Sequence, residues 1–250
     1  MKNKTTSRNN PKYDYRFSII IPIHNEALIL DESIGNLLLL LDTDIYKGKY
    51  ELLLCENGST DETLSIAKKI ENSNSAVRVE ILPNPSYGLA LRHGISVAQG
   101  EITVIFNADY WDFSFLTEAI ILLKDYDIVV GSKNAPGAKD HRPIYRRLIT
   151  ILFNRLLRFL FLYEGTDTHG IKVTYSDIAK ALVKQCKTGR EIFDTEFIIR
   201  AWKQKYSICE IPVTVKEIRP SRSSIWRRIP RTILDLFTLL LYSGKKRIRK

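Results

Sequence analysis

The chain alternates between short apolar runs and longer segments in which apolar residues recur every three or four positions. The runs are rich in Ile, Val and Leu and end in polar residues, which is typical of buried strands. We expect strands at Phe17–Ile23, Tyr50–Cys55, 77–84, 101–109 and 126–132. Helical periodicity predicts helices at 28–43, from about 61, at 88–100 and at 113–125. Ser59 or Thr60 is placed to cap the second of these helices, and Gly100 to end the third.

Alternation of strands and helices over the first 130 residues predicts an α/β fold with a mostly parallel, doubly wound sheet. In such sheets ligands bind beyond the carboxyl ends of the strands. Polar clusters stand at four of these ends, at 24–26, 56–59, 107–109 and 132–133. Four clusters at one edge favour a binding site over four unrelated loops.

The fourth strand ends in Asn107, Ala108 and Asp109, and Asp112 follows shortly after. Mg²⁺ and Mn²⁺ prefer oxygen ligands and often link a carboxylate to substrate phosphates. Asp109 is the best candidate ligand, Asn107 offers an amide oxygen, and Asp112 adds a carboxylate if the chain turns back. The alternative is that Asp109 caps the helix that begins near Phe113.

The second half contains two long apolar segments with clustered arginines, at 142–163 and 225–250. Each is either a core helix or an amphipathic helix that lies on a membrane with its arginines at lipid phosphates. Two such segments in one chain favour the membrane surface. No stretch reaches about 20 apolar residues without a charge, so we expect no membrane-spanning helix.

Charge and cysteine content narrow the function classes. The net charge is +10, and the excess of basic residues is concentrated in two segments. Residues 139–158 include six basic residues and one acid, and residues 219–250 include ten basic residues and one acid. These segments would suit phosphates or anionic lipid, although 245–250 alone could be a solvated tail. The basic residues interrupt Leu, Ile and Phe runs, which disfavours a nucleic-acid-binding protein. Three widely spaced cysteines disfavour a disulfide framework or zinc site.

The ordered motifs resemble the family 2 glycosyltransferases of the GT-A (Rossmann-like) fold. "IIIPIHNE", "LLLCENGSTDET", "NPSYGLALRHGISVAQGEITVIFNAD" and "DIVVGSK" are similar to the family's successive motifs. "GTDTHGIKVTYSDIAKALV" and "IFDTEFIIRAWKQKYSICEIPVTV" resemble segments of the dolichyl-phosphate glucosyl- and mannosyltransferases within it. The chain lacks the Q-x-x-R-W motif of processive polysaccharide synthases.

The resemblance implies an inverting transfer of a hexose from UDP- or GDP-hexose to a polyprenyl or dolichyl phosphate, with Mg²⁺ or Mn²⁺. Such a protein would be peripheral, at the cytoplasmic face of a membrane. A phosphate acceptor is already an oxyanion and needs no strong general base. The implied organisation is a polar, poorly ordered leader without a signal peptide at 1–16, a GT-A domain at 17–218, and a basic amphipathic membrane-associating segment at 219–250.

By position, the resemblance also implies roles for individual residues. The nucleotide-sugar pocket would comprise Pro22, His24, Glu26, Glu56, Asn57, Asn107 and Ala108. The catalytic group would comprise Asp109, Lys133, Arg146 and Arg222. The acceptor side would comprise Arg147, Asp167, Asp194 and Glu196. Of the candidate metal ligands Asp109, Asn107 and Asp112, the resemblance implies Asp109, and the other two rest on their chemistry alone. Two alternatives stay open: Glu196 could pair with Arg200 along a helix, and Asp167 could be a turn or cap residue.

Five positions depart from the family pattern. Asn107 replaces the first acid of D-A-D, Glu56-Asn57 replaces D-D, His24 replaces a Tyr, and Lys133 replaces an Arg. Together these changes reduce the negative charge at the edge of the sheet where the metal would bind. Three consequences stay open: a donor that differs from the common ones, a low affinity for the metal, or loss of activity. The other functions that stay open are transfer to a glycan or lipid headgroup, and a catalytically weak GT-A domain that acts as a membrane-associated partner subunit.

Overall fold

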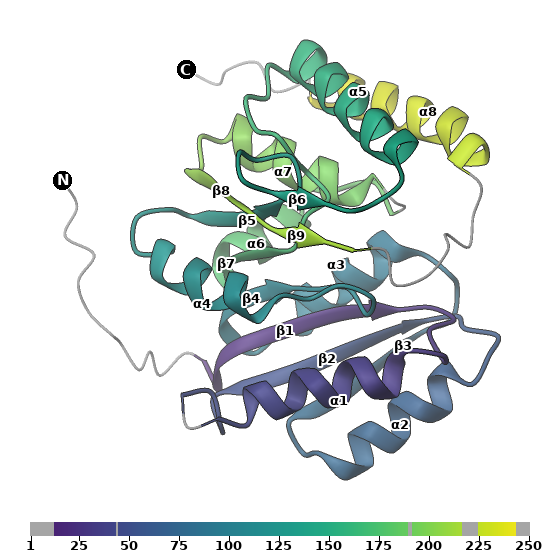
Figure 1. The fold of residues 1–250 in the computed structure, drawn as a ribbon, viewed down its shortest axis with the longest axis vertical. Coiled ribbons are helices and arrows are strands. Elements are labelled where there is room, and N and C mark those ends of the chain that lie inside the picture. The colour runs from purple at the N-terminus through teal and green to yellow at the C-terminus, as the bar shows by residue number, and fades with distance from the viewer. Residues whose placement is uncertain (1–12, 44, 190–191, 217–224, 244–250) are drawn as a thin grey trace.

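The computed structural model describes residues 13–43, 45–189, 192–216 and 225–243 (Figure 1). Most of the predicted leader, Arg222 and the basic tail at 244–250 lie outside the described residues.

A seven-stranded sheet forms the centre of the molecule, in the order β3-β2-β1-β4-β7-β5-β8. Its strands are β1 Tyr15–Ile23, β2 Tyr50–Asn57, β3 Val77–Leu82, β4 Gly100–Ile105, β5 Ile128–Ser132, β7 Lys172–Tyr175 and β8 Ile208–Pro212. All neighbours pair in parallel except β7, which lies antiparallel to both β4 and β5. A separate two-stranded sheet pairs β6 (Lys139–Asp140) with β9 (Thr214–Val215). The prediction of a mostly parallel α/β sheet is confirmed.

Helices cover both faces of the sheet (Figure 1). They are α1 Leu30–Leu41, α2 Thr63–Ser73, α3 Tyr87–Val97, α4 Phe113–Leu122, α5 Ile144–Phe161, α6 Ser176–Val183, α7 Phe193–Lys203 and α8 Ile225–Ser243. Helices α1, α2 and α4 pack in one core cluster, and α3, α5, α6, α7 and α8 pack in the other. In β1, Ile19 and Ile21 face the first cluster and Ile20 faces the second. Burial on both faces explains why β1, β2, β4 and β5 are continuous apolar runs.

Two predicted helix ends differ from the structure. Helix α2 begins at Thr63, whose backbone N–H donates to Asp61 Oδ1 at 3.0 Å, so neither Ser59 nor Thr60 caps it. Helix α3 ends at Val97, and Gly100 starts β4 instead. A Cβ on Gly100 would lie 2.5 Å from the backbone carbon of Phe17. This glycine therefore allows two strands to meet closely and does not end a helix.

Helices α5 and α8 each bury a narrow stripe, and among their described side chains many others are exposed. Leu157 and Phe161 of α5 join Leu236 and Leu239 of α8 in the second core cluster. Many other apolar side chains on both helices face solvent. Each helix thus packs in the core through one stripe of side chains and also has exposed apolar side chains. In the described part of the chain, we find no helix with the length and apolar character needed to cross a membrane.

Candidate functional site

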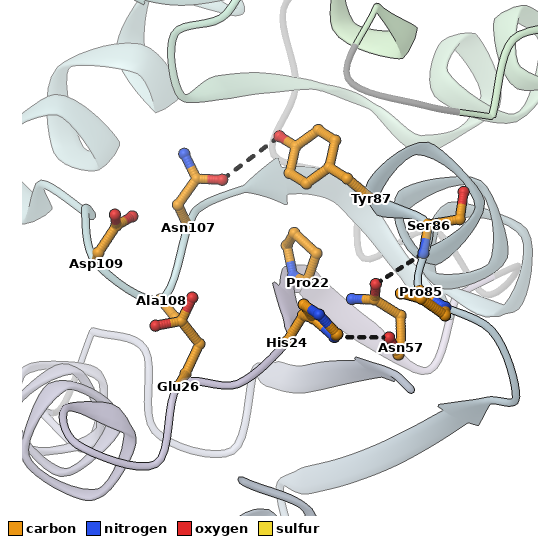
Figure 2. Close-up of a pocket in the computed structure, with 10 residues that line it drawn as sticks. All are labelled: Pro22, His24, Glu26, Asn57, Pro85, Ser86, Tyr87, Asn107, Ala108 and Asp109. Carbon is orange, nitrogen blue, oxygen red and sulfur yellow. Dashed lines mark hydrogen bonds between the residues drawn. The ribbon is translucent and has the colours of Figure 1, made fainter. Parts of the chain in front are cut away.

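A cavity of about 450 Å³ opens at the carboxyl ends of β1, β2 and β4 (Figure 2). That volume lies within the range of small-molecule sites. It is lined by Pro22, His24, Glu26, Asn57, Pro85, Ser86, Tyr87, Asn107, Ala108 and Asp109. Three of the four predicted polar strand ends therefore contribute to one cavity. The fourth, at 132–133, does not line it.

A tight turn after β4 presents Asp109 to the cavity. The Asn107 N–H donates to the Tyr110 carbonyl at 3.0 Å, and the Tyr110 N–H donates to the Asn107 carbonyl at 3.2 Å. Ala108 and Asp109 therefore form the tip of a closed two-residue turn. Helix α1 fixes this tip, because Ser33 Oγ donates to the Ala108 carbonyl at 2.7 Å.

Asp112, and not Asp109, caps the following helix. Asp112 is the N-cap of α4, and its Oδ1 accepts a hydrogen bond from the Phe115 N–H at 3.0 Å. The alternative that Asp109 provides this cap is therefore wrong. Asp112 does not line the cavity. A metal-binding role for it stays a prediction.

The loops after β1 and β2 are joined by side chain to backbone hydrogen bonds. Asn25 has a φ of 54°, and its Oδ1 accepts from the Thr60 N–H at 2.7 Å. The His24 ring contacts the Asn57 carbonyl through Nδ1 at 3.0 Å. A carbonyl only accepts, so Nδ1 carries a proton and donates it in this contact. These contacts set the position of His24 at the cavity wall.

Asn57 shapes the wall through both ends of its amide. Its Nδ2 donates to the Ile23 carbonyl at 2.8 Å, and its Oδ1 accepts from the Ser86 N–H at 2.9 Å. An aspartate could not donate to Ile23, which gives a physical reason for the asparagine here. Its neighbour Glu56 is buried, accepts from the Ser59 N–H at 2.6 Å and does not line the cavity.

Tyr87 lines the cavity at the start of α3 and was not among the predicted residues. Its hydroxyl donates to Asp194 Oδ2 at 2.8 Å. Burial, together with the charge of Asp194 and this hydrogen bond, raises the pKa of Tyr87 well above its usual range, so the hydroxyl keeps its proton. Asp194 also forms an ion pair with Lys172 at 2.8 Å. Asp194 thus holds the Tyr87 hydroxyl in place without lining the cavity itself.

Lys133 and Asp167 form a second buried ion pair, with 2.6 Å between Nζ and Oδ2. Burial acts to raise the pKa of Asp167, but the charge and hydrogen bond of Lys133 outweigh it, so the pKa lies below its usual range. Asp167 Oδ1 also accepts from the His169 N–H at 2.9 Å. Asp167 is therefore a turn residue, as one alternative predicted, and a partner for Lys133.

Glu196 pairs with Arg200 at 2.5 Å, four residues later on α7, so that alternative is confirmed. The same carboxylate accepts from the backbone N–H groups of Lys187 and Thr188. It thereby holds a loop whose Gly189 carbonyl accepts from Ser86 Oγ at the cavity edge. Glu196 supports this edge without lining the cavity.

The remaining predicted residues are not brought to the cavity. Arg146 and Arg147 lie in the first turn of α5 and do not line it. Arg222 lies outside the described residues.

The oxygens at the turn fit a hard divalent cation. Asp109 offers a carboxylate and Asn107 an amide group on the same side of the cavity (Figure 2). Over the described ranges, no three His, Cys, Asp or Glu side chains gather closely enough to hold a metal ion by themselves. Mg²⁺ is commonly bound by one or two carboxylates with waters and substrate phosphates. The donor set therefore suits a cation whose coordination a diphosphate completes.

Comparison with known proteins identifies the family. The family model for Glycosyl transferase family 2 matches residues 18–180. This chain belongs to glycosyl transferase family 2. This family 2 glycosyltransferase is 26% identical over 202 residues to glycosyltransferase AglD of Haloferax volcanii, covering 78% of this chain and 32% of AglD. The chain thus spans about a third of the length of that relative.

Two further likenesses extend over most of the family 2 glycosyltransferase. It is 27% identical over 239 residues to dolichyl-phosphate beta-glucosyltransferase ALG5D of Trichomonas vaginalis, covering 90% of this chain and 73% of the relative. A crystal structure of glucosyl-3-phosphoglycerate synthase from Mycobacterium tuberculosis, in complex with Mn²⁺, UDP and glucosyl-3-phosphoglycerate, superposes with a TM-score of 0.66. The identity to it is 18%, with 91% of this chain and 79% of that chain covered. This likeness establishes the GT-A fold.

Proposed function

We propose that this family 2 glycosyltransferase transfers a hexose from a nucleotide-diphosphate sugar to a polyprenyl or dolichyl phosphate at a membrane surface, with inversion at the anomeric carbon. The observation that carries the proposal is the cavity at the strand ends, into which a fixed turn presents Asp109.

The donor would lie along the cavity with its diphosphate at the turn. Asp109 and Asn107 would hold Mg²⁺ or Mn²⁺, and the solved relative was crystallised with Mn²⁺ and UDP. When bound, the cation would stabilise negative charge on the departing diphosphate. His24 and Pro22 line the part of the cavity formed by β1, where they would contact the nucleoside.

The acceptor chemistry makes few demands on the protein. A phosphate oxygen can attack the anomeric carbon in line with the leaving diphosphate, and it needs no deprotonation by a strong base. The protein would act mainly by positioning the reactants and excluding water. Lys133, Arg146 and Arg222 remain the proposed cations for phosphate charge, with Lys133 in an ion pair with Asp167.

A lipid acceptor is supported by one relative and by the surface of two helices. ALG5D is named as a dolichyl-phosphate glucosyltransferase. Large apolar side chains on α5 and α8 are exposed and form what we call the α5–α8 apolar surface. They are Ile144, Tyr145, Leu148, Ile151, Leu152, Leu156, Phe159, Ile233, Leu234, Phe237, Leu241 and Tyr242. Both helices lie at one end of the molecule (Figure 1).

This surface has the composition of a helix pair that lies in a membrane interface. Exposed apolar surface of this extent marks interaction sites in soluble domains. Arg147, Arg155 and Arg158 of α5 are also exposed, which suits anionic lipid phosphates. We therefore propose peripheral attachment, at the cytoplasmic face, where nucleotide sugars would meet the lipid acceptor.

A comparison of acceptors tests the proposed function. The protein would be incubated with UDP- and GDP-hexoses, Mn²⁺ and either a short-chain polyprenyl phosphate, a glycan or a lipid headgroup. We expect transfer to the polyprenyl phosphate, with an inverted anomeric configuration measured by NMR. Transfer to the glycan or headgroup alone would refute the lipid phosphate acceptor. Nucleotide binding without transfer to any acceptor would favour the partner-subunit alternative.

A further inference from the structure

We propose that Tyr87 is a positioning residue that turns the amide of Asn107 so that its oxygen faces Asp109 and the bound cation. This inference rests on the proposed function, because it concerns the cation that would hold the donor diphosphate. Its basis is a chain of contacts that runs from Lys172 through Asp194 and Tyr87 to Asn107.

The chain begins with a buried ion pair. The side chains of Lys172 and Asp194 are 1% and 3% exposed, and Nζ and Oδ1 are 2.8 Å apart. Lys172 Nζ also donates to the Gly170 carbonyl at 2.6 Å. Buried charges are stable when they are paired and hydrogen-bonded, and an ionised carboxylate only accepts hydrogen bonds. Asp194 Oδ2 is thus an acceptor in a fixed position.

Tyr87 uses its one proton on this acceptor. The distance from its hydroxyl to Asp194 Oδ2 is 2.8 Å, whereas the distance to the Asn107 amide is 3.4 Å. Hydrogen bonds to an ionised group are the shorter and stronger ones. Since a hydroxyl carries one proton, the Tyr87 oxygen can only accept from Asn107.

The amide of Asn107 can donate through Nδ2 alone. Figure 2 shows its oxygen toward Tyr87, which brings two acceptors face to face. A half-turn of the amide exchanges nitrogen and oxygen without changing its shape, and the hydrogen-bond network decides between the two orientations. The network selects Nδ2 toward Tyr87. Oδ1 then lies on the other side of the amide, where Asp109 stands (Figure 2).

This arrangement accounts for an asparagine at this position. An aspartate would place a carboxylate against a hydroxyl whose proton already goes to Asp194. Asn107 avoids that conflict and still supplies one oxygen beside Asp109. The cation would then meet one charged and one neutral ligand from the turn.

The test is a double-mutant cycle read as Mn²⁺ affinity, measured by the EPR signal of free Mn²⁺ in the presence of UDP. Tyr87→Phe is expected to weaken Mn²⁺ binding about threefold to tenfold, as the loss of one hydrogen bond predicts. In an Asn107→Asp background the two oxygens are equivalent, so Tyr87→Phe should have no such effect. Tyr110→Phe is the matched control, because the Tyr110 backbone closes the same turn and its buried hydroxyl has no hydrogen-bond partner among the described residues.

The outcomes separate this inference from the proposed function. If the wild type binds Mn²⁺ with UDP and Tyr87→Phe binds it equally well, the orienting role is refuted and the function stands. An equal loss in the Asn107→Asp background also refutes it. If the wild type binds no Mn²⁺, both proposals fail. Should Tyr87→Phe not fold, NMR of the wild type decides: strong NOEs are expected between the Asn107 Nδ2 protons and the Tyr87 ring, and their absence overturns the inference.

Discussion

Replacement of Asp109 by Ala is expected to reduce sugar transfer by at least about a hundredfold. The carboxylate stands at the tip of a turn closed by two backbone hydrogen bonds and faces the cavity. Removing it would take away the charged ligand for the cation and so the stabilisation of the departing diphosphate, and losses of this kind cost a factor of about 10²–10³. The measurement is the initial rate of transfer to a polyprenyl phosphate at saturating Mn²⁺.

Asp31→Ala is a suitable control for this experiment. Asp31 is an exposed acid in the first turn of α1 and does not line the cavity. The Asp31→Ala substitution removes the same charge from the protein as Asp109→Ala. Its rate of sugar transfer should stay within about twofold of the wild-type rate, because exposed charges interact weakly with distant groups. Near-wild-type transfer by Asp109→Ala would show that the site is assigned wrongly.

The double substitution Leu152→Glu with Phe159→Glu is expected to weaken binding to anionic vesicles about a hundredfold. These side chains are 68% and 81% exposed on the α5–α8 apolar surface. Burying each in a membrane interface would contribute roughly 1.5–3 kcal/mol, and the two new carboxylates would also be repelled by anionic lipid. Sedimentation with phosphatidylserine-containing vesicles measures the effect.

Leu39→Glu controls for a general effect of a new surface charge. Leu39 is 75% exposed on α1, which packs in the other core cluster, so its substitution should leave vesicle binding nearly unchanged. Higher salt is expected to weaken wild-type binding, because screening reduces the attraction between arginines and lipid phosphates. Equal sedimentation of the double variant and the wild type would contradict a membrane role for this surface.

The sequence predicted β1, β2, β4 and β5 because these strands are almost fully buried on both faces and are therefore continuous apolar runs, and it also predicted β3. It did not predict β8, which lies parallel to β5 and is mostly only partly buried. It did not predict β7, which comes after α5 in the chain and is inserted between β4 and β5. β7 has four residues, and its place depends on pairing with strands distant in sequence. Local periodicity carries no information on such pairing.

The candidate site was predicted where it follows from the geometry of parallel strands. His24, Asn57 and Asp109 all stand at strand ends and meet at one cavity. Tyr87 was missed because it does not stand at a strand end: it is the first residue of α3, one residue before the helix predicted at 88–100. Asp194 and Glu196 were predicted for the acceptor side. The structure shows that both carboxylates are buried and that each forms an ion pair, Asp194 with Lys172 and Glu196 with Arg200.

The proposed boundary between a GT-A domain and a C-terminal segment at 218/219 stays a prediction. Within the described residues, Leu236 and Leu239 of α8 are buried in the same cluster as α3, α6 and α7. The C-terminal helix therefore shares the core of the catalytic domain. Its apolar pattern predicted an amphipathic helix, but the pattern could not show which stripe meets the core and which meets solvent.

Calorimetric titration of UDP and GDP into the protein, with Mn²⁺ or with a chelator, shows whether the cavity binds a nucleoside diphosphate through a metal ion. Asp109 and Asn107 are proposed to hold a cation, and a nucleoside diphosphate would complete the coordination of that cation. We predict that one of the two nucleotides binds in the presence of Mn²⁺ and that its binding is lost when the chelator removes the metal. Failure of both UDP and GDP to bind with either Mn²⁺ or Mg²⁺ would contradict the account.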